Sequence, residues 1–245
     1  MRLVLLIAVL VLSCAESAHP PLPPDAIPLR SDVYVQPIAP GVWRHVSYRE
    51  FPGVGSFPSN GLVVSSPKGA LIVDTAWDPE QTALILDWVE ANVGSVGALV
   101  ATHAHDDRIG GLAEVKRRRI PSYALAKTAA LAAAQGLPAI DHAVDSGFSL
   151  ADLGVAGELF FAGPAHTVDN GTVWLEQPRI LVGGCMVRAA AADALGNVSE
   201  ADVANWPRAV AALQERYPNA RIVVPGHGEP GGPELLVHTR ELLGQ

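Results

Sequence analysis

The sequence THAHDDRIGG, residues 102–111, places three metal-binding side chains within five residues. These are His103, His105 and Asp107, and they directly follow the apolar run ALVA at residues 98–101. A short apolar run that is followed by glycine-flanked polar residues predicts a buried strand with the donors in the loop after it. A lone HxH pattern is weak evidence for a metal, so the prediction depends on further donors elsewhere in the chain.

Three more donors follow apolar or aromatic runs in glycine-rich segments. They are His166 in GPAHTVDN, Cys185 in VGGCMV and His227 in VPGHGEP. Together with the first loop they supply four imidazoles, one carboxylate and one thiol. Imidazole and thiolate favour zinc, and six donors are too many for one tetrahedral ion but suit two sites that each leave room for solvent. The pattern predicts a hydrolase with two Zn²⁺ per chain.

Composition limits the classes of partner. The chain has 245 residues, of which 49% are hydrophobic, and this is ample for a large buried core. Its 17 Lys and Arg against 25 Asp and Glu give a net charge of -8, which argues against nucleic acid or an anionic membrane surface as a partner. We expect a monomer acting on a small molecule.

The first 18 residues have the pattern of an export leader, with one positive charge before an apolar stretch too short to span a bilayer. Two processing routes are open: lipidation at Cys14, which the lipobox-like VLSC favours, or ordinary cleavage nearby. We therefore expect a periplasmic enzyme, and an outer-membrane lipoprotein if Cys14 is lipidated. Residues 19–30 are proline-rich and predict an extended tether before a catalytic domain at 31–245. Without Cys14, Cys185 has no disulfide partner in an oxidising compartment, and metal ligation would protect its thiol.

The order of the predicted elements indicates an α/β (α+β) fold. Strands occur in runs with helices between and after them, so we expect two mixed sheets packed face to face with helices outside. The loop at residues 50–58 is rich in Phe, Pro and Gly and suggests an apolar flap. The expected strands are 33–37, 42–47, 62–65, 70–74, 98–101, 158–162, 172–176, 180–182 and 221–224, and the expected helices begin at Pro79, Gly110, Ser199 and Pro233.

Seven short motifs make the chain resemble the class B metallo-β-lactamases of subclass B1, such as the Verona and New Delhi types. The motifs are FPSNGLVV, VDTAW, HAHDDRIGG, GPAHTVDN, GGC, LGN and PGHG. The resemblance implies an αββα four-layer sandwich. It assigns one zinc to His103, His105 and His166, and the other to Asp107, Cys185 and His227. The wider superfamily usually has HxHxDH and lacks this cysteine, whereas here Arg108 occupies the last position.

The resemblance also implies a function and roles for further residues. The expected reaction is hydrolysis of the β-lactam amide of penicillins, cephalosporins and carbapenems, which confers antibiotic resistance. Asp107 would orient the nucleophile and the Asn197 amide would polarise the lactam carbonyl. Arg188 would bind the substrate carboxylate. A surface role for Arg188 and a turn role for Asn197 are the simpler alternatives.

Supporting roles are expected for residues around the ligands. Asp74 would steer a ligand imidazole, and Arg108 would lie beneath the second metal and pair with a carboxylate. Phe51 and Phe57 would line the flap, while we expect Trp77 in the core.

Other functions are less consistent with the sequence. Residues 65–68, SSPK, match the SxxK of serine β-lactamases, but they lie on a predicted hairpin without the accompanying motifs. A di-zinc hydrolase of the same superfamily with a lactone or thioester substrate is the main alternative. A zinc-binding protein without catalysis is the other.

Overall fold

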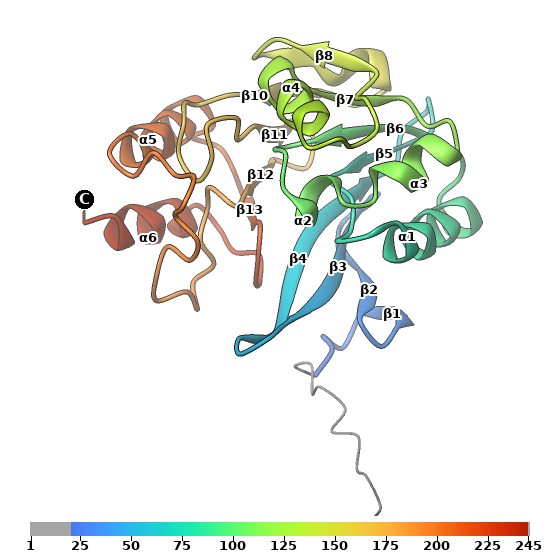
Figure 1. Ribbon diagram of the computed structural model, residues 1–245, viewed down its shortest axis with the longest axis horizontal. Helices are drawn as coiled ribbons and strands as arrows, with labels where there is room; N and C mark the ends of the chain where they lie inside the picture. Colours follow the sequence, from blue (N-terminus) through green and yellow to red (C-terminus); the bar gives the residue numbers. More distant parts are fainter. Residues whose placement is uncertain (1–20, 245) are drawn as a thin grey trace, which may run out of the picture.

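Two β-sheets form the centre of the protein, whose computed structural model describes residues 21–244 (Figure 1). One sheet has eight strands in the order β1 to β8, and the other has five in the order β13-β12-β11-β10-β9. Apolar side chains of both sheets, such as Leu62, Val100 and Val182, form a buried core between them. Helices α1 and α3 cover the outer face of the first sheet, and α5 and α6 cover that of the second (Figure 1). The expected αββα four-layer sandwich is confirmed.

The strands alternate with short connections along the chain. They are β1 (Ile27–Arg30), β2 (Val33–Ala39), β3 (Val42–Phe51), β4 (Gly55–Val64), β5 (Ala70–Val73), β6 (Val96–Ala101), β7 (Ser122–Leu125), β8 (His142–Val144), β9 (Phe148–Ser149), β10 (Gly157–Phe160), β11 (Thr172–Leu175), β12 (Ile180–Gly184) and β13 (Ile222–Pro225). The helices are α1 (Pro79–Asn92), α2 (Asp106–Ile109), α3 (Leu112–Arg117), α4 (Ala126–Ala134), α5 (Trp206–Arg216) and α6 (Glu234–Leu242), with a 3₁₀ turn at Leu150–Leu153.

Strand direction determines where the donors meet. β12 and β13 are parallel neighbours, with Gly184 opposite Pro225, so the residues that follow both strands leave the sheet at the same edge. In the first sheet, β6 lies between the parallel strands β5 and β7 and ends at Ala101, just before the loop with the first donors. The sandwich thus brings segments more than 100 residues apart to one edge.

The start of the domain differs from the expected boundary. Ile27–Arg30 form strand β1, which pairs with β2, so the last four residues of the expected tether at 19–30 belong to the sheet. Pro28 argues against a central strand, but β1 is the edge of the sheet, where a proline is tolerated. The expected leader and Cys14 lie outside the described residues. Within residues 21–244, no helix is both long and apolar enough to cross a membrane.

Two other elements also differ from their expected bounds. The flap is the end of the β3–β4 hairpin, because the two strands pair up to Phe51 and Gly55 instead of opening into a loop at residue 50. The hairpin tip projects from the body of the protein (Figure 1). Helix α5 begins at Trp206, seven residues after the expected start, with Pro207 in its first turn.

Candidate metal centre and active site

A cleft of about 590 Å³ lies between the β3–β4 hairpin and the loops at one edge of the sandwich. Its walls come from distant parts of the chain, and many of the residues predicted from sequence face it. The lining residues are Arg49, Phe51, Val54, Phe57, Trp77, Ala104, His105, Asp106, Asp107, Gln135, His166, Gly196, Asn197 and His227.

The loop after β6 presents two imidazoles at close range. Its conformation is fixed by the backbone N–H of Ala104, which donates to Asp169 Oδ2 at 3.0 Å. His103 is buried and His105 is half-buried, with Nε2 of His103 3.2 Å from Nδ1 of His105. Their ring centroids are 4.8 Å apart, edge to face. Two imidazole nitrogens at this distance can bind one ion from adjacent directions.

His166 completes a group of three imidazoles from the second sheet. It lies on the β10–β11 connection, where Asn170 Oδ1 accepts two backbone N–H groups of the turn. The His166 ring lies 5.3 Å from the rings of both His103 and His105. Its Nδ1 is buried and has no hydrogen-bond partner. An unpaired buried ring nitrogen costs free energy unless a water reaches it.

The second group of donors consists of Asp107, Cys185 and His227. Cys185 Sγ is 3.1 Å from His227 Nε2 and 3.3 Å from Asp107 Oδ2. His227 Nδ1 lies 2.7 Å from the carbonyl oxygen of Pro58, which can only accept, so Nδ1 carries the proton and Nε2 is free to bind a cation. The thiol of Cys185 thus lies within hydrogen-bond distance of both the carboxylate of Asp107 and the imidazole of His227.

Arg108 forms the floor beneath this second group. It is fully buried, and its Nη2 lies 2.7 Å from Asp107 Oδ2 and 3.1 Å from Cys185 Sγ. The same guanidinium lies 3.4 Å from Asp74 Oδ2 and donates to the carbonyl oxygens of Asn60 and Gly226. One cation therefore links two buried carboxylates, the thiol, strand β4 and the loop after β13.

Asp74, which was expected to steer a ligand imidazole, reaches His103 only through Thr102. Its carboxylate accepts the Thr102 N–H at 2.7 Å and the Thr102 hydroxyl at 3.0 Å, and it meets no imidazole. Thr102 Oγ1 in turn lies 3.4 Å from His103 Nδ1. Burial raises the pKa of Asp74 to about 6, against the opposing effect of Arg108. Asp74 also has a left-handed backbone, with φ of 62°, which is uncommon outside glycine.

The protonation of the donors suits a metal ion. Burial lowers the pKa of His166 to about 3 and that of His227 to about 4, and it also lowers the pKa of His103. These imidazoles are therefore neutral at pH 7 and have a free lone pair. Burial raises the pKa of Asp107, but Arg108 and the nearby imidazoles outweigh it and lower this pKa below its ordinary value. Burial raises the pKa of Cys185, so its thiol would lose a proton on binding a metal.

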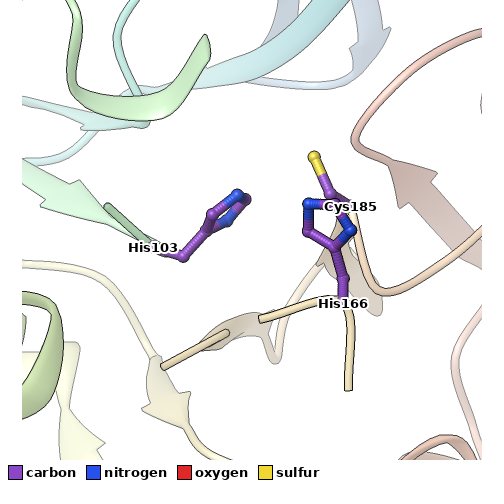
Figure 2. A group of neighbouring side chains, drawn as sticks. All are labelled: His103, His166 and Cys185. Carbon is purple, nitrogen blue, oxygen red and sulfur yellow. The ribbon is translucent and has the colours of Figure 1, made fainter. Parts of the chain in front are cut away.

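The donors form three groups of three residues that share members. Within each group, the potential ligand atoms lie within 4.8 Å of one another. Figure 2 shows one of them, with His103 on one loop and His166 and Cys185 on two others. The other two are His103 with His105 and Asp107, and Asp107 with Cys185 and His227. The structure brings all six predicted donors together, and their softness and neutral imidazoles fit zinc.

The residues predicted to bind substrate divide into two sets. Phe51, Phe57 and Asn197 line the cleft, and the Phe57 ring lies 4.7 Å from the ring of His227. Arg188 does not line it: its Nε donates to the Ala194 carbonyl oxygen at 3.2 Å.

Several residues of the site were missed or placed differently in the sequence analysis. Trp77, expected in the core, is buried but also lines the cleft and stacks on His227. Glu200 Oε2 lies 3.1 Å from His105 Nε2, and no local pattern marks it because the contact spans 95 residues. Arg49 and Gln135 line the cleft as well. Arg49 could have been found from alternation, since it precedes Phe51 by two residues on one strand.

Comparisons with known proteins agree with this geometry. Residues 54–227 match the family model described as the metallo-beta-lactamase superfamily. The metallo-beta-lactamase type 2 of Bacillus cereus is 41% identical over 203 residues, which cover 82% of this chain and 79% of that protein.

Two solved structures are also similar over most of their length. A metallo-beta-lactamase from Pontibacter korlensis has a TM-score of 0.84 at 41% identity, covering 87% of this chain and 99% of that one. The metallo-beta-lactamase FIM-1 from Pseudomonas aeruginosa, solved in a mono-zinc form, has a TM-score of 0.82 at 37% identity, covering 89% and 97%. The donor groups, the sandwich and these matches agree, and the chain belongs to the metallo-β-lactamase superfamily.

Proposed function

We propose that this protein is a di-zinc β-lactamase that hydrolyses penicillins, cephalosporins and carbapenems and so confers resistance to them. The observation that carries the proposal is the convergence of four imidazoles, a carboxylate and a thiol on one edge of the sandwich, most of them at an open cleft. Type 2 enzymes among the relatives are named for the same activity.

The donors divide into two sets in the proposal. His103, His105 and His166 hold one zinc in this proposal, supported by pairwise separations of 4.8 to 5.3 Å between the centroids of their rings. Asp107, Cys185 and His227 hold the other. FIM-1 was solved with one zinc, so the two sites can differ in affinity, and occupancy is a quantity to measure.

Zinc, when bound, supplies a Lewis acid and brings the pKa of water toward neutrality, which is the chemistry that amide hydrolysis needs. The side chains of the protein would position the attacking water and the substrate. Asp107, held by Arg108, would accept a hydrogen bond from the attacking water, and the Asn197 amide would donate to the lactam oxygen. Phe51 and Phe57 would cover the lactam and exclude bulk water.

Metal analysis combined with turnover tests the proposal. We expect two zinc ions per chain and hydrolysis of benzylpenicillin, a carbapenem and a chromogenic cephalosporin, with the monobactam aztreonam spared. His103→Ala should lose zinc and activity, whereas His142→Ala, an exposed histidine on β8, should lose neither. Zinc without lactam turnover would reject the proposal. Preferred hydrolysis of a lactone or thioester would then assign the chain to the other branch of the superfamily.

We further propose that the protein acts as a monomer in the periplasm, held at the outer membrane if Cys14 is lipidated. The support is the leader-like composition of residues 1–18 and the net charge of -8, which disfavours anionic partners.

A further inference from the structure

Arg49 is the only arginine or lysine that lines the cleft among residues 21–244. Arg188, the residue expected to bind a carboxylate, is turned toward the backbone of Ala194. A substrate entering the cleft therefore meets one guanidinium, and it lies on the β3–β4 hairpin. Arginine binds carboxylates well because its planar N–H groups match the two oxygens.

The hairpin holds the Arg49 side chain over the cleft. Arg49 pairs across the strands with Phe57, and side chains of such pairs share one face of a sheet. Its guanidinium carbon lies 5.7 Å from the ring centroids of both Phe51 and Trp77, within the range of a cation–π contact. These rings keep the charge near the cleft instead of in bulk solvent.

Arg49 forms a solvent-exposed ion pair with Asp106. Nη1 of Arg49 lies 2.9 Å from Asp106 Oδ2, and the two side chains are 45% and 60% exposed. An ion pair exposed to this degree contributes little stability, because water competes for both groups. A carboxylate that arrives on a ligand can therefore replace Asp106 at small cost.

We propose that Arg49 is a specificity-determining residue that binds a carboxylate on the acyl side chain of the substrate. This inference rests on the proposed function. Arg49 and its aromatic neighbours Phe51 and Phe57 form the flap wall of the cleft, and the acyl side chain is the part of a β-lactam that varies between substrates. Asp106 takes the place of the substrate carboxylate when the cleft is empty and leaves Arg49 when the carboxylate binds.

Benzylpenicillin and carbenicillin test the proposal, because carbenicillin differs from benzylpenicillin only by a carboxylate on the acyl side chain. The readout is the ratio of the KM for carbenicillin to the KM for benzylpenicillin, measured at known zinc content. Arg49→Gln should raise this ratio by roughly three- to tenfold, the range of a partly solvated charge-assisted hydrogen bond. Arg208→Gln, an exposed arginine on α5, is the matched control and should not change the ratio.

Two further variants separate charge from packing. Asp106→Asn removes the competing carboxylate and should lower the ratio, and Arg49→Lys should keep most of the wild-type ratio because the charge remains. An unchanged ratio in Arg49→Gln would overturn the proposal. Equal effects of Gln and Lys would also overturn it, because the cause would then be lost packing on Phe51 and Trp77. Equal increases in both KM values would mean that Arg49 binds the ring carboxylate instead. Failure of the wild type to hydrolyse benzylpenicillin would instead reject the proposed function.

Discussion

Arg108 is the buried cation that contacts the acidic groups of the site. It is fully buried and contacts Asp107, Asp74 and Cys185. The family resemblance implied that Arg108 lies below the second metal and beside a carboxylate, and it contacts Asp107. Its second carboxylate and its two carbonyl partners could not be predicted, since they come from segments 34 to 118 residues away.

Replacing Arg108 by Met should strongly destabilise the protein. Two buried carboxylates would lose their cation, and breaking a buried pair in this way costs about 3–5 kcal/mol. Urea unfolding of the zinc-free protein measures the loss without a contribution from the metal. The exposed Arg208→Met should change the unfolding free energy by no more than about 0.5 kcal/mol. Equal stability of Arg108→Met and the wild type would show that the carboxylates do not need this cation.

Cys185→Ser should weaken mainly one zinc site. A hydroxyl is a far poorer zinc ligand than a thiolate, and Cys185 contacts only donors of the second set at hydrogen-bond distance. We expect the affinity of that site to fall by more than roughly a hundredfold, because loss of an outer partner alone costs 10–100-fold. Competition titration with a zinc chelator resolves the two affinities. An equal decrease at both sites would contradict the assignment of Cys185 to one ion.

Among the secondary-structure elements, the flap is the one whose composition predicted a loop where the structure has mostly paired strands. Pro52, Gly53 and Pro58 predict a loop, yet only residues 52–54 form the turn, and Pro58 pairs with Tyr48 inside the hairpin. The reason is tertiary: β5 pairs with β4 only from residue 62 onward, so the stretch before it has one neighbour and tolerates Pro58. Helix α1, by contrast, begins at Pro79 after its cap Asp78, as predicted, because both signals are local.

Helix α3 carries a pH-dependent link to α1. The Glu114 carboxylate is 7% exposed and accepts hydrogen bonds from Arg117 and Arg118, and Arg118 also pairs with Asp87 of α1. The hydrogen bonds from Arg117, followed by those from Arg118, lower the pKa of Glu114 to about 2 from its ordinary 4.5. A carboxyl whose pKa is lowered by folding stabilises the protein above its unfolded pKa and loses that effect as the pH falls.

Glu114→Gln should therefore reduce the unfolding free energy by about 1 kcal/mol at pH 7. The difference from wild type should shrink as the pH falls from 4.5 toward 2. Thermal unfolding across this range measures it, with Glu215→Gln on the exposed side of α5 as the control. A difference that stays constant with pH would mean that the ionised carboxyl of Glu114 does not stabilise this link.

At the scale of the whole molecule, the sandwich and the convergence of the donors could be predicted from sequence. The donors were found because each follows an apolar run and lies near glycine. β7, β8, β9 and α4 were not predicted: three are strands of two to four residues, and the sequence AKTAALAAA of α4 has little contrast between its faces. Glu200 was missed as a site residue because its contact with His105 arises only from packing, and Arg49 was missed because the expected strand ended at residue 47 instead of 51.

Removal of metal should abolish activity and lower the melting temperature together. Ligands that bind only the folded state stabilise it by mass action, by about 4 kcal/mol at a thousandfold excess over Kd. Calorimetry and penicillin turnover before and after chelation test this expectation, and zinc should restore both. Turnover by a demonstrably metal-free sample would contradict the proposed chemistry.

Cys14→Ser should move the expressed protein from the membrane fraction to the soluble periplasmic fraction, because lipidation requires this thiol. Fractionation with an antibody measures the shift. A wild-type protein that is already soluble would favour ordinary cleavage of the leader.

The division of the donors between the sheets has a mechanical consequence. His103, His105 and Asp107 follow β6 of the first sheet, whereas His166, Cys185 and His227 follow strands of the second. Each proposed zinc thus takes ligands from both sheets, two from one and one from the other. The ions would act as cross-links between the layers, in a part of the chain where Cys185 is the only cysteine described and is free. Zinc starvation would then do more than stop catalysis: it would let the two layers separate at this edge and make the enzyme a better substrate for proteases.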